Sequence, residues 1–319
     1  MSANFSDADT YPHAHPRVTV VGCGGAGNNT INSIHRSITG VARTVALNTD
    51  AAHLLSIRAD KKLLIGRGTT GGRGAGGNVQ LGRRAAEEAK DSIRREIEGS
   101  DMVFILAGMG GGTGTGSSIV VASAAREAGV LPVSIVSMPF AFEKGRTERA
   151  RDYLRELVFL SESTVMLEND RLAAAFPDQS MHSAFTVMDT LISDLVSNVT
   201  NALVRPSLLN INYSDLRSVM RSGKTSTMIF SENEDVYSLV RDAVRLPMLQ
   251  QSISDAKGAI IHVSGGKSLT LEKVHRILEQ AHDSLGRYAN IILGAREDER
   301  ESPLLSMTAI VTGVGSEAF

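Results

Sequence analysis

Residues 108–117, Gly-Met-Gly-Gly-Gly-Thr-Gly-Thr-Gly-Ser, constrain the fold of this chain more than any other stretch. They lie between an apolar run, Met102 to Ala107, that predicts a buried strand, and Ser118 to Ala128, which predicts a helix. Six glycines in ten residues let the backbone turn sharply and approach an anion, because no Cβ stands in the way. The helix start offers unpaired N–H groups, and hydroxyl donors follow at Thr113, Thr115 and Ser117. The stretch therefore predicts a phosphate site, and a flexible linker is the less favoured alternative.

Short apolar runs alternate with amphipathic segments over the first half of the chain. The predicted strands are Val18 to Val21, Val41 to Leu47, Leu63 to Ile65, Met102 to Ala107 and Pro132 to Ser137. The predicted helices are Asn29 to Ser37, Leu81 to Glu98, Ser118 to Ala128 and Arg146 to Leu160. This alternation predicts an α/β fold, a Rossmann-like parallel sheet covered by helices on both faces, with ligands at the carboxyl ends of the strands.

A long helix divides the chain. Met181 to Arg205 has apolar residues at helical spacing, and Pro206 ends it. The strands predicted beyond it are Met228 to Phe230, Ala259 to Val263, Asn290 to Leu293 and Met307 to Val311. We therefore expect a disordered tail (1–16), a ligand-binding domain (17–180), a central helix with its following loop (181–224) and a smaller α/β domain (225–319).

Composition excludes several function classes. A net charge of −2 gives no general attraction to nucleic acid or to a membrane surface. Cys23 is the only cysteine, so neither an internal disulfide nor a cysteine-rich metal site is expected. No apolar run reaches the roughly 18 residues of a membrane span, and the N-terminus does not resemble a signal peptide. We expect a cytoplasmic protein with no direct membrane insertion.

Two further glycine-rich turns follow predicted strands. Gly22 to Gly27 fits G-x-G-x-x-G, which alone suits a nicotinamide-dependent dehydrogenase as well as another nucleotide binder. Asn48-Thr49-Asp50 stands where a dinucleotide enzyme places its ribose-binding acid, so this turn leaves both open. Gly66 to Asn78, with Arg67 and Arg73, predicts either a phosphate-sensing loop or a mobile surface loop. One dehydrogenase domain would not need three such turns, which favours the other kind of nucleotide binder.

The glycine-rich stretch resembles GGGTGTG, the signature of the tubulin/FtsZ GTPases. Other family motifs follow in order from Arg17 onward and are closest to the FtsZ branch: Gly22 to Asn32, Asn48 to Ala51, Arg73 to Asn78, Pro139 to Glu143, Asn169 to Arg171, and Arg205 to Met220. The resemblance implies a GTPase domain, a long central helix and a smaller C-terminal domain. It also implies GTP or GDP with Mg²⁺ as ligands, and head-to-tail assembly of the chain with itself.

The resemblance assigns roles to individual residues. It implies phosphate and loop contacts from Gly24, Gly25, Ala26, Gly27, Asn28, Asn29, Asn48, Asp50, Gly74, Ala75, Gly76, Gly110, Gly111, Gly112, Thr113, Gly114, Thr115 and Gly116. It implies ribose contacts from Pro139, Glu143 and Arg146, although Glu143-Lys144-Gly145-Arg146 is one residue shorter than the usual E-G-x-x-R. Guanine would be read by Asn169 and Asp189, because a carboxylate accepts both N–H groups that guanine, but not adenine, presents. Phe185 would stack on the base, and core packing is its alternative role.

The catalytic residues are expected in the loop Asn210 to Asp215. In the family this loop enters the pocket of the next subunit, and its acids position water and help to hold the cation. FtsZ usually reads N-x-D-x-x-D, whereas this chain has Asn212 at the first acid and keeps Asp215. An amide cannot supply the negative charge, so we expect hydrolysis that is slowed or altered in its cation dependence. The alternatives are a nucleotide-dependent assembly regulator without hydrolysis and, for Asp215, a cap on a helix over Leu216 to Arg221.

The resemblance also implies cellular context. FtsZ acts with other division proteins at mid-cell, and it commonly carries a disordered linker and a C-terminal peptide that binds membrane adaptors. This chain ends at Phe319, soon after its last predicted strand. We therefore expect recruitment to the division site without assigning a tail-mediated membrane contact.

Overall fold

The computed structural model describes residues 15–178, 180–205, 207–245, 248–249, 251–286, 288–298 and 302–315. Most of the tail predicted over residues 1–16 lies outside this part, as does Pro206, the predicted end of the long helix. The strands form one ten-stranded sheet in the order β3-β2-β1-β4-β5-β6-β7-β10-β8-β9. Their bounds are β1 Val18–Cys23, β2 Ala42–Asn48, β3 Lys61–Leu64, β4 Met102–Gly108, β5 Leu131–Met138, β6 Ser163–Glu168, β7 Thr225–Asn233, β8 Gly258–Gly265, β9 Asn290–Glu297 and β10 Leu305–Thr312.

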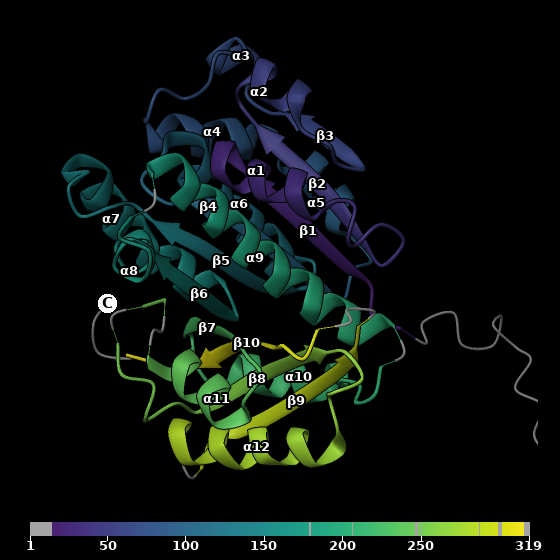
Figure 1. Cartoon of the computed structure of the whole chain (residues 1–319). Coiled ribbons are helices and arrows are strands. Elements are labelled where there is room, and N and C mark those ends of the chain that lie inside the picture. Colours follow the sequence, from purple (N-terminus) through teal and green to yellow (C-terminus); the bar gives the residue numbers. More distant parts are fainter. Residues whose placement is uncertain are drawn as a thin grey trace, which may run out of the picture.

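Helices cover both faces of this sheet (Figure 1). In chain order they are α1 Gly24–Ile34, α2 Ala51–Ser56, α3 Arg67–Thr70, α4 Val79–Glu88, α5 Lys90–Ile97, α6 Gly112–Glu127, α7 Lys144–Leu160, α8 Asn169–Ala175, α9 Met181–Val204, α10 Tyr213–Arg221, α11 Val236–Arg245 and α12 Leu271–Leu285. Alternate residues of β1 point to opposite faces: Val20 packs in the core under α1, α9 and α10, and Val21 in the core under α4 to α7. The expected α/β architecture with a long central helix is confirmed.

The sheet is mainly parallel and continues past the predicted domain boundary. β1 pairs in parallel with β2 and β4, and Val18 lies opposite both Ala42 and Met102. β6 pairs in parallel with β7, where Thr164 faces Thr225. β10 then runs antiparallel between β7 and β8. The two halves of the molecule thus share hydrogen-bonded strands, and α9 crosses the face of the sheet between them (Figure 1).

Three local predictions need correction. The single helix predicted over Leu81 to Glu98 is wrong, because the backbone leaves the helical region at Ala89 (φ −104°, ψ 8°), where the Ala89 N–H bonds to the carbonyl of Ala86 and so tightens the turn. The strand Ser163–Glu168 was not predicted, since it is short and mixes polar with apolar residues. Helices α1 and α6 also begin earlier than predicted, inside the glycine-rich turns at Gly24 and Gly112.

Candidate functional site

Two helix N-termini meet where β1 and β4 end. Helix α1 begins at Gly24 and α6 at Gly112; neither has a side-chain cap or an acidic residue in its first turn. A Cβ on Gly24, whose φ is +69°, would lie 2.6 Å from the Gly114 nitrogen, so the two turns touch only because both positions are glycine. Uncapped helix N-termini offer N–H groups and the positive ends of helix dipoles, so this corner is a candidate site for an anionic ligand.

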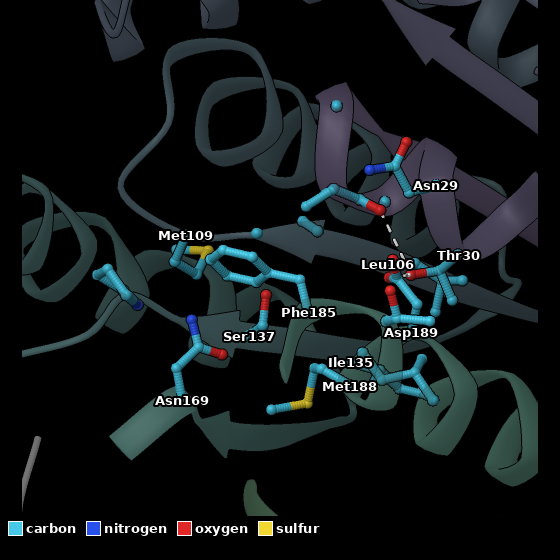
Figure 2. Close-up of a pocket in the computed structure, with 18 of the residues that line it drawn as sticks. Asn29, Thr30, Leu106, Met109, Ile135, Ser137, Asn169, Phe185, Met188 and Asp189 are labelled. Atoms are coloured by element: carbon cyan, nitrogen blue, oxygen red, sulfur yellow. Dashed lines mark hydrogen bonds between the residues drawn. The ribbon is translucent and has the colours of Figure 1, made fainter. Parts of the chain in front are cut away.

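A cavity of about 410 Å³ opens beside this corner, at the carboxyl ends of the parallel strands. Figure 2 shows several of the side chains that line it. The lining residues are Gly25, Ala26, Gly27, Asn29, Thr30, Leu106, Ala107, Gly108, Met109, Ile135, Ser137, Pro139, Glu143, Arg146, Asn169, Phe185, Thr186, Met188, Asp189 and Ile192. Residues from α1, β4, β5, α7, α8 and α9 therefore converge on one pocket.

The α9 side of the pocket has a polar edge and an aromatic face. Thr30 Oγ1 donates a hydrogen bond to Asp189 Oδ1 at 2.7 Å, and burial raises the pKa of the Asp189 carboxyl while this hydrogen bond lowers it. Asn169 is buried with its Oδ1 unpartnered, which leaves an acceptor for a ligand. Phe185 is 42% exposed and meets Phe140 edge-on, with ring centroids 5.8 Å apart. A carboxylate, an amide and an open ring face suit a purine base.

The ribose candidates lie at the start of α7. Pro139, Glu143 and Arg146 all line the pocket. Arg146 Nη1 donates to Glu143 Oε2 at 2.6 Å, and Glu143 Oε1 also accepts the N–H of Phe140 at 3.2 Å. Glu143 and Arg146 are three positions apart and form an ion pair at the pocket wall.

The signature residues 110–116 form the turn and the first part of α6, beside the pocket lining. Gly110 has a φ of +82°, and its N–H donates to Thr115 Oγ1 at 2.9 Å. Gly111 precedes the helix, and Gly112, Gly114 and Gly116 pack tightly against neighbouring backbone. Thr113 Oγ1 lies 2.6 Å from Thr49 Oγ1, and Ser117 Oγ donates to the Thr113 carbonyl. The Ser117 hydroxyl is therefore used within the fold, and Thr115 Oγ1 accepts the Gly110 N–H. The N–H groups of the first turn of α6 are the candidate donors for a phosphate.

The two asparagines after the first glycine turn face different ways. Asn28 is buried, and its Nδ2 donates to the Leu47 carbonyl at 3.2 Å. Asn29 lines the pocket, and its Oδ1 lies 3.0 Å from His53 Nε2. Asn28 thus joins α1 to β2, whereas Asn29 is available to a ligand.

The loops after β2 and β3 bind to each other beside the pocket. Asn48 Oδ1 accepts the N–H groups of Thr49 and Asp50, and Asp50 caps α2. The backbones of Asp50 and Arg73 form an isolated antiparallel β-bridge, and the Gly74 N–H donates to the Thr49 carbonyl. A Cβ on Gly112 would lie 2.9 Å from that of Ala75, so the loop containing Gly74, Ala75 and Gly76 packs directly on the signature turn.

The predicted catalytic residues lie at the far end of α9. Asp189 precedes the end of this helix, Val204, by 15 positions, which corresponds to about 22 Å. Asn210 Oδ1 accepts from the N–H and hydroxyl of Ser207. Asn212 caps α10 by accepting the N–H of Ser214, so the helix begins earlier than predicted and Asp215 lies exposed in its first turn. These residues do not line the nucleotide pocket of their own chain.

Several pocket residues had no signal in the sequence. The pocket is also lined by Thr30 of α1, Met109 of the turn after β4, Ser137 of β5, and Met188 and Ile192 of α9. Only the helical spacing of Thr30 from Ala26 could have indicated a shared face. Within the described ranges no three His, Cys, Asp or Glu side chains gather into a metal centre, and no described helix is both long and apolar enough to span a bilayer.

Comparisons with known proteins agree with this geometry. Residues 17–177 match the GTPase domain of the tubulin/FtsZ family, and residues 218–315 match the C-terminal domain of the FtsZ family. The chain is 40% identical over 304 residues to cell division protein FtsZ 2 of Halobacterium salinarum. The aligned region covers 94% of this chain and 77% of that protein. The cell division protein FtsZ 2 of Methanocaldococcus jannaschii is also 40% identical, over 94% of this chain and 80% of its own.

A solved structure points the same way. An empty FtsZ dimer from M. jannaschii has a TM-score of 0.91 and 36% identity, over 98% of this chain and 93% of its own. A CetZ2 protofilament structure from Haloferax volcanii, at 22% identity and a TM-score of 0.80, shares the fold. The sequence matches, the structure and the order of the motifs together show that this chain belongs to the tubulin/FtsZ family of GTPases, in its FtsZ branch.

Proposed function

We propose that this chain binds GTP, assembles head-to-tail into filaments and hydrolyses GTP where Asp215 of a neighbouring copy enters the pocket. The observation that carries the proposal is the position of two partial sites, the pocket and the exposed Asp215, at opposite ends of α9. Gly25 and Asp189 line the pocket, whereas Asp215 lies exposed beyond the other end of the helix. A chain with one partial site at each end gains a complete site only when a second copy docks end to end.

Such a contact joins different surfaces of the two copies. Contacts of this kind do not close on themselves, so they produce filaments. One solved structure of a relative is described as an FtsZ dimer, which supports self-association of this chain as well. Phosphoryl transfer depends mainly on positioning and on charge, so a site divided between two subunits is chemically reasonable.

The nucleotide would bind with its base against Phe185 and its phosphates at the two helix N-termini. Asp189 would accept hydrogen bonds from guanine, and Asn169 would provide a second polar contact. Mg²⁺ would bind phosphate oxygens and reduce their charge. The loop 66–78 would be ordered by the terminal phosphate through its contact with Asp50, so that hydrolysis weakens the filament.

Relatives named as cell division proteins support a role in the division ring, at mid-cell. Division proteins and membrane adaptors are then the expected further partners.

Sedimentation and light scattering test this proposal. Equal concentrations of GTP, GDP and ATP are added to the full chain with Mg²⁺, and we expect filaments with GTP alone. Filaments of the same amount with ATP would contradict guanine recognition by Asp189 and Asn169.

Asn212 supports a second candidate, a nucleotide-dependent assembly regulator with weak or absent hydrolysis. Its amide is used as the cap of α10 and has no negative charge with which to attract a cation. GTP-dependent light scattering without phosphate release would favour this candidate over the first.

A further inference from the structure

A second cavity, of about 400 Å³, lies near the C-terminal end of α9. It has no lining residue in common with the nucleotide pocket. In Figure 1 this end of α9 lies close to β9, and α9 contacts both β8 and β9. The cavity is lined by Asn201, Ala202, Arg205, Ser207, His262 and Arg296.

The lining carries positive charge without a matching negative charge. Arg205 and Arg296 both reach the cavity, and no carboxylate lines it. Across the residues that the structure describes, neither arginine forms an ion pair. Two guanidinium groups that share a cavity repel each other, so an anion between them would be stabilised.

Two buried polar atoms beside the arginines also lack partners. His262 is only 3% exposed, and its Nδ1 has no hydrogen bond; the Oδ1 of Asn201, a residue 6% exposed, has none either. Buried polar atoms are normally paired, so unpaired atoms in two residues that line the cavity indicate a guest that forms hydrogen bonds. The Asn201 oxygen needs a donor, such as the hydroxyl of a hydrogen phosphate, and the His262 nitrogen can accept or donate.

The imidazole contributes a hydrogen bond and no charge. Burial, followed by the positive charge of Arg296, lowers the pKa of His262 to about 4. At neutral pH the ring therefore has one nitrogen that donates and one that accepts. Attraction for an anion then comes from the planar forks of the arginines, which match carboxylate and phosphate oxygens.

The cavity also borders the loop 207–212, which joins α9 to α10 and so precedes Asp215. Leu209 and Ala295 exchange two backbone hydrogen bonds of 3.1 Å, which fasten this loop to β9 next to Arg296. Ser207, at the start of the loop, lines the cavity and donates to Asn210. A ligand bound here would contact the end of α9, the start of the loop and β9, on both sides of the Leu209–Ala295 hydrogen bonds.

We propose that this cavity binds a small oxyanion, a phosphate or carboxylate group, between Arg205 and Arg296, and thereby fixes the position of the loop 207–212, which leads into α10 and Asp215. The binding half of the proposal is independent of the proposed function, and the loop half rests on it.

Isothermal titration calorimetry tests the binding half. Inorganic phosphate or succinate is titrated into the full chain saturated with GDP, with chloride at equal ionic strength as the reference. We expect saturable binding of at least one of the two probes, weakened about tenfold or more by Arg296→Gln and by Arg205→Gln, since each removes charged hydrogen bonds. Arg94→Gln, at an exposed arginine of α5, is the matched control and should leave binding unchanged.

The two probes also separate the sources of the ligand group. Binding of phosphate alone indicates a phosphate compound, and binding of succinate alone indicates a carboxylate. No saturable binding of either probe, or equal affinity in the native chain and both cavity variants, would overturn the proposal. Arg205 is exposed, so its variant keeps the test valid even if Arg296→Gln fails to fold.

Formation of GDP from GTP, measured by chromatography, tests the loop half, with whichever of the two probes binds as the addition. The saturating probe should change turnover at least twofold in the native chain and leave turnover in Arg205→Gln at its own basal value. Binding without any change in turnover would overturn the coupling alone. A chain that hydrolyses no GTP at all would contradict the proposed function and leave the calorimetric result standing.

Discussion

The nucleotide pocket and the loop after α9 differ in almost every physical respect. The pocket is built from buried backbone and from side chains that other elements hold in place, such as Asp189 bonded to Thr30. The loop and the first turn of α10 place Asn210, Asn212 and Asp215 on the surface, where the described hydrogen bonds of the two asparagines are local. The difference supports our proposal that a single chain binds nucleotide and that hydrolysis requires a second copy.

The largest effect should come from removing the acid of the loop. Asp215→Ala should lower turnover of GTP by about a hundredfold or more, because a group that positions or deprotonates water is lost. Affinity for GTP should not change, since Asp215 lies outside the pocket of its own chain. Phosphate release and equilibrium binding measure the two quantities, with Ser218→Ala on the same exposed stretch of α10 as the control. A parallel loss of binding would break the comparison.

Removing the acid of the pocket should have the opposite signature. Asp189→Ala should weaken GTP binding by about 30- to 100-fold, because guanine N–H groups lose their acceptor. Turnover at saturating GTP should stay near the native value. Asp189→Asn replaces the acceptor with an amide that can also donate, so it should improve binding of xanthosine relative to guanosine nucleotides. Competition with GTP, XTP and ATP measures the change; unaltered selectivity would contradict the assigned role.

Substitutions at two glycines of α1, Gly25 and Gly27, should separate an effect on ligand binding from an effect on stability. A Cβ on Gly27 would overlap the carbonyl of Leu106, so Gly27→Ala should lower the free energy of unfolding by about 3 kcal/mol. A Cβ on Gly25 would meet nothing within 4 Å, so Gly25→Ala should fold normally and weaken GTP binding about tenfold, where the phosphates would lie. Denaturant unfolding and nucleotide titration compare the two variants. Equal stability of both would show that the α1–β4 contact is looser than the structure has it.

The pH dependence of binding should reflect the burial of Asp189 first and its hydrogen bond from Thr30 second. Guanine recognition needs the ionised Asp189 carboxylate, whose pKa burial raises, so affinity should fall as the pH drops through that raised value. The Thr30 hydroxyl favours the ionised form, so Thr30→Val should shift this fall to higher pH and weaken binding a few-fold at neutral pH. GTP affinity measured from pH 5 to 8 gives both curves. Coincident curves would show that Thr30 has no influence on the carboxyl.

The smallest effect concerns Asn212. Asn212→Asp keeps an equally good cap on α10 and adds a negative charge, so turnover should rise a few-fold and depend more steeply on Mg²⁺. Asn212→Ser, which keeps a cap without the charge, should leave turnover at the native value. A rise in both variants would assign the effect to the cap rather than to the charge.

Sequence patterns predicted the parts of the molecule that depend on local chemistry. Buried apolar runs gave β1 and β4, and the glycines of the signature predicted a turn that the structure confirms, with Gly110 at positive φ. The family matches then confirmed the resemblance that these motifs carried.

Contacts between distant segments could not be predicted in the same way. Thr30 and Asp189 are 159 positions apart, and neither has a local pattern that indicates the other. The start of α1 at Gly24, rather than after the turn, rotates Asn28 into the core and Asn29 into the pocket. Which residue of such a pair meets a ligand depends on the exact start of the helix, which sequence patterns define poorly.

The dependence of turnover on protein concentration tests the central claim most directly. Phosphate release per subunit is measured at saturating GTP and Mg²⁺ over a range of protein concentrations, for the native chain and for Asp215→Ala. A site completed by a second copy predicts turnover per subunit that rises with concentration in the native chain and is lost in the variant. Turnover per subunit that is independent of concentration would contradict the claim.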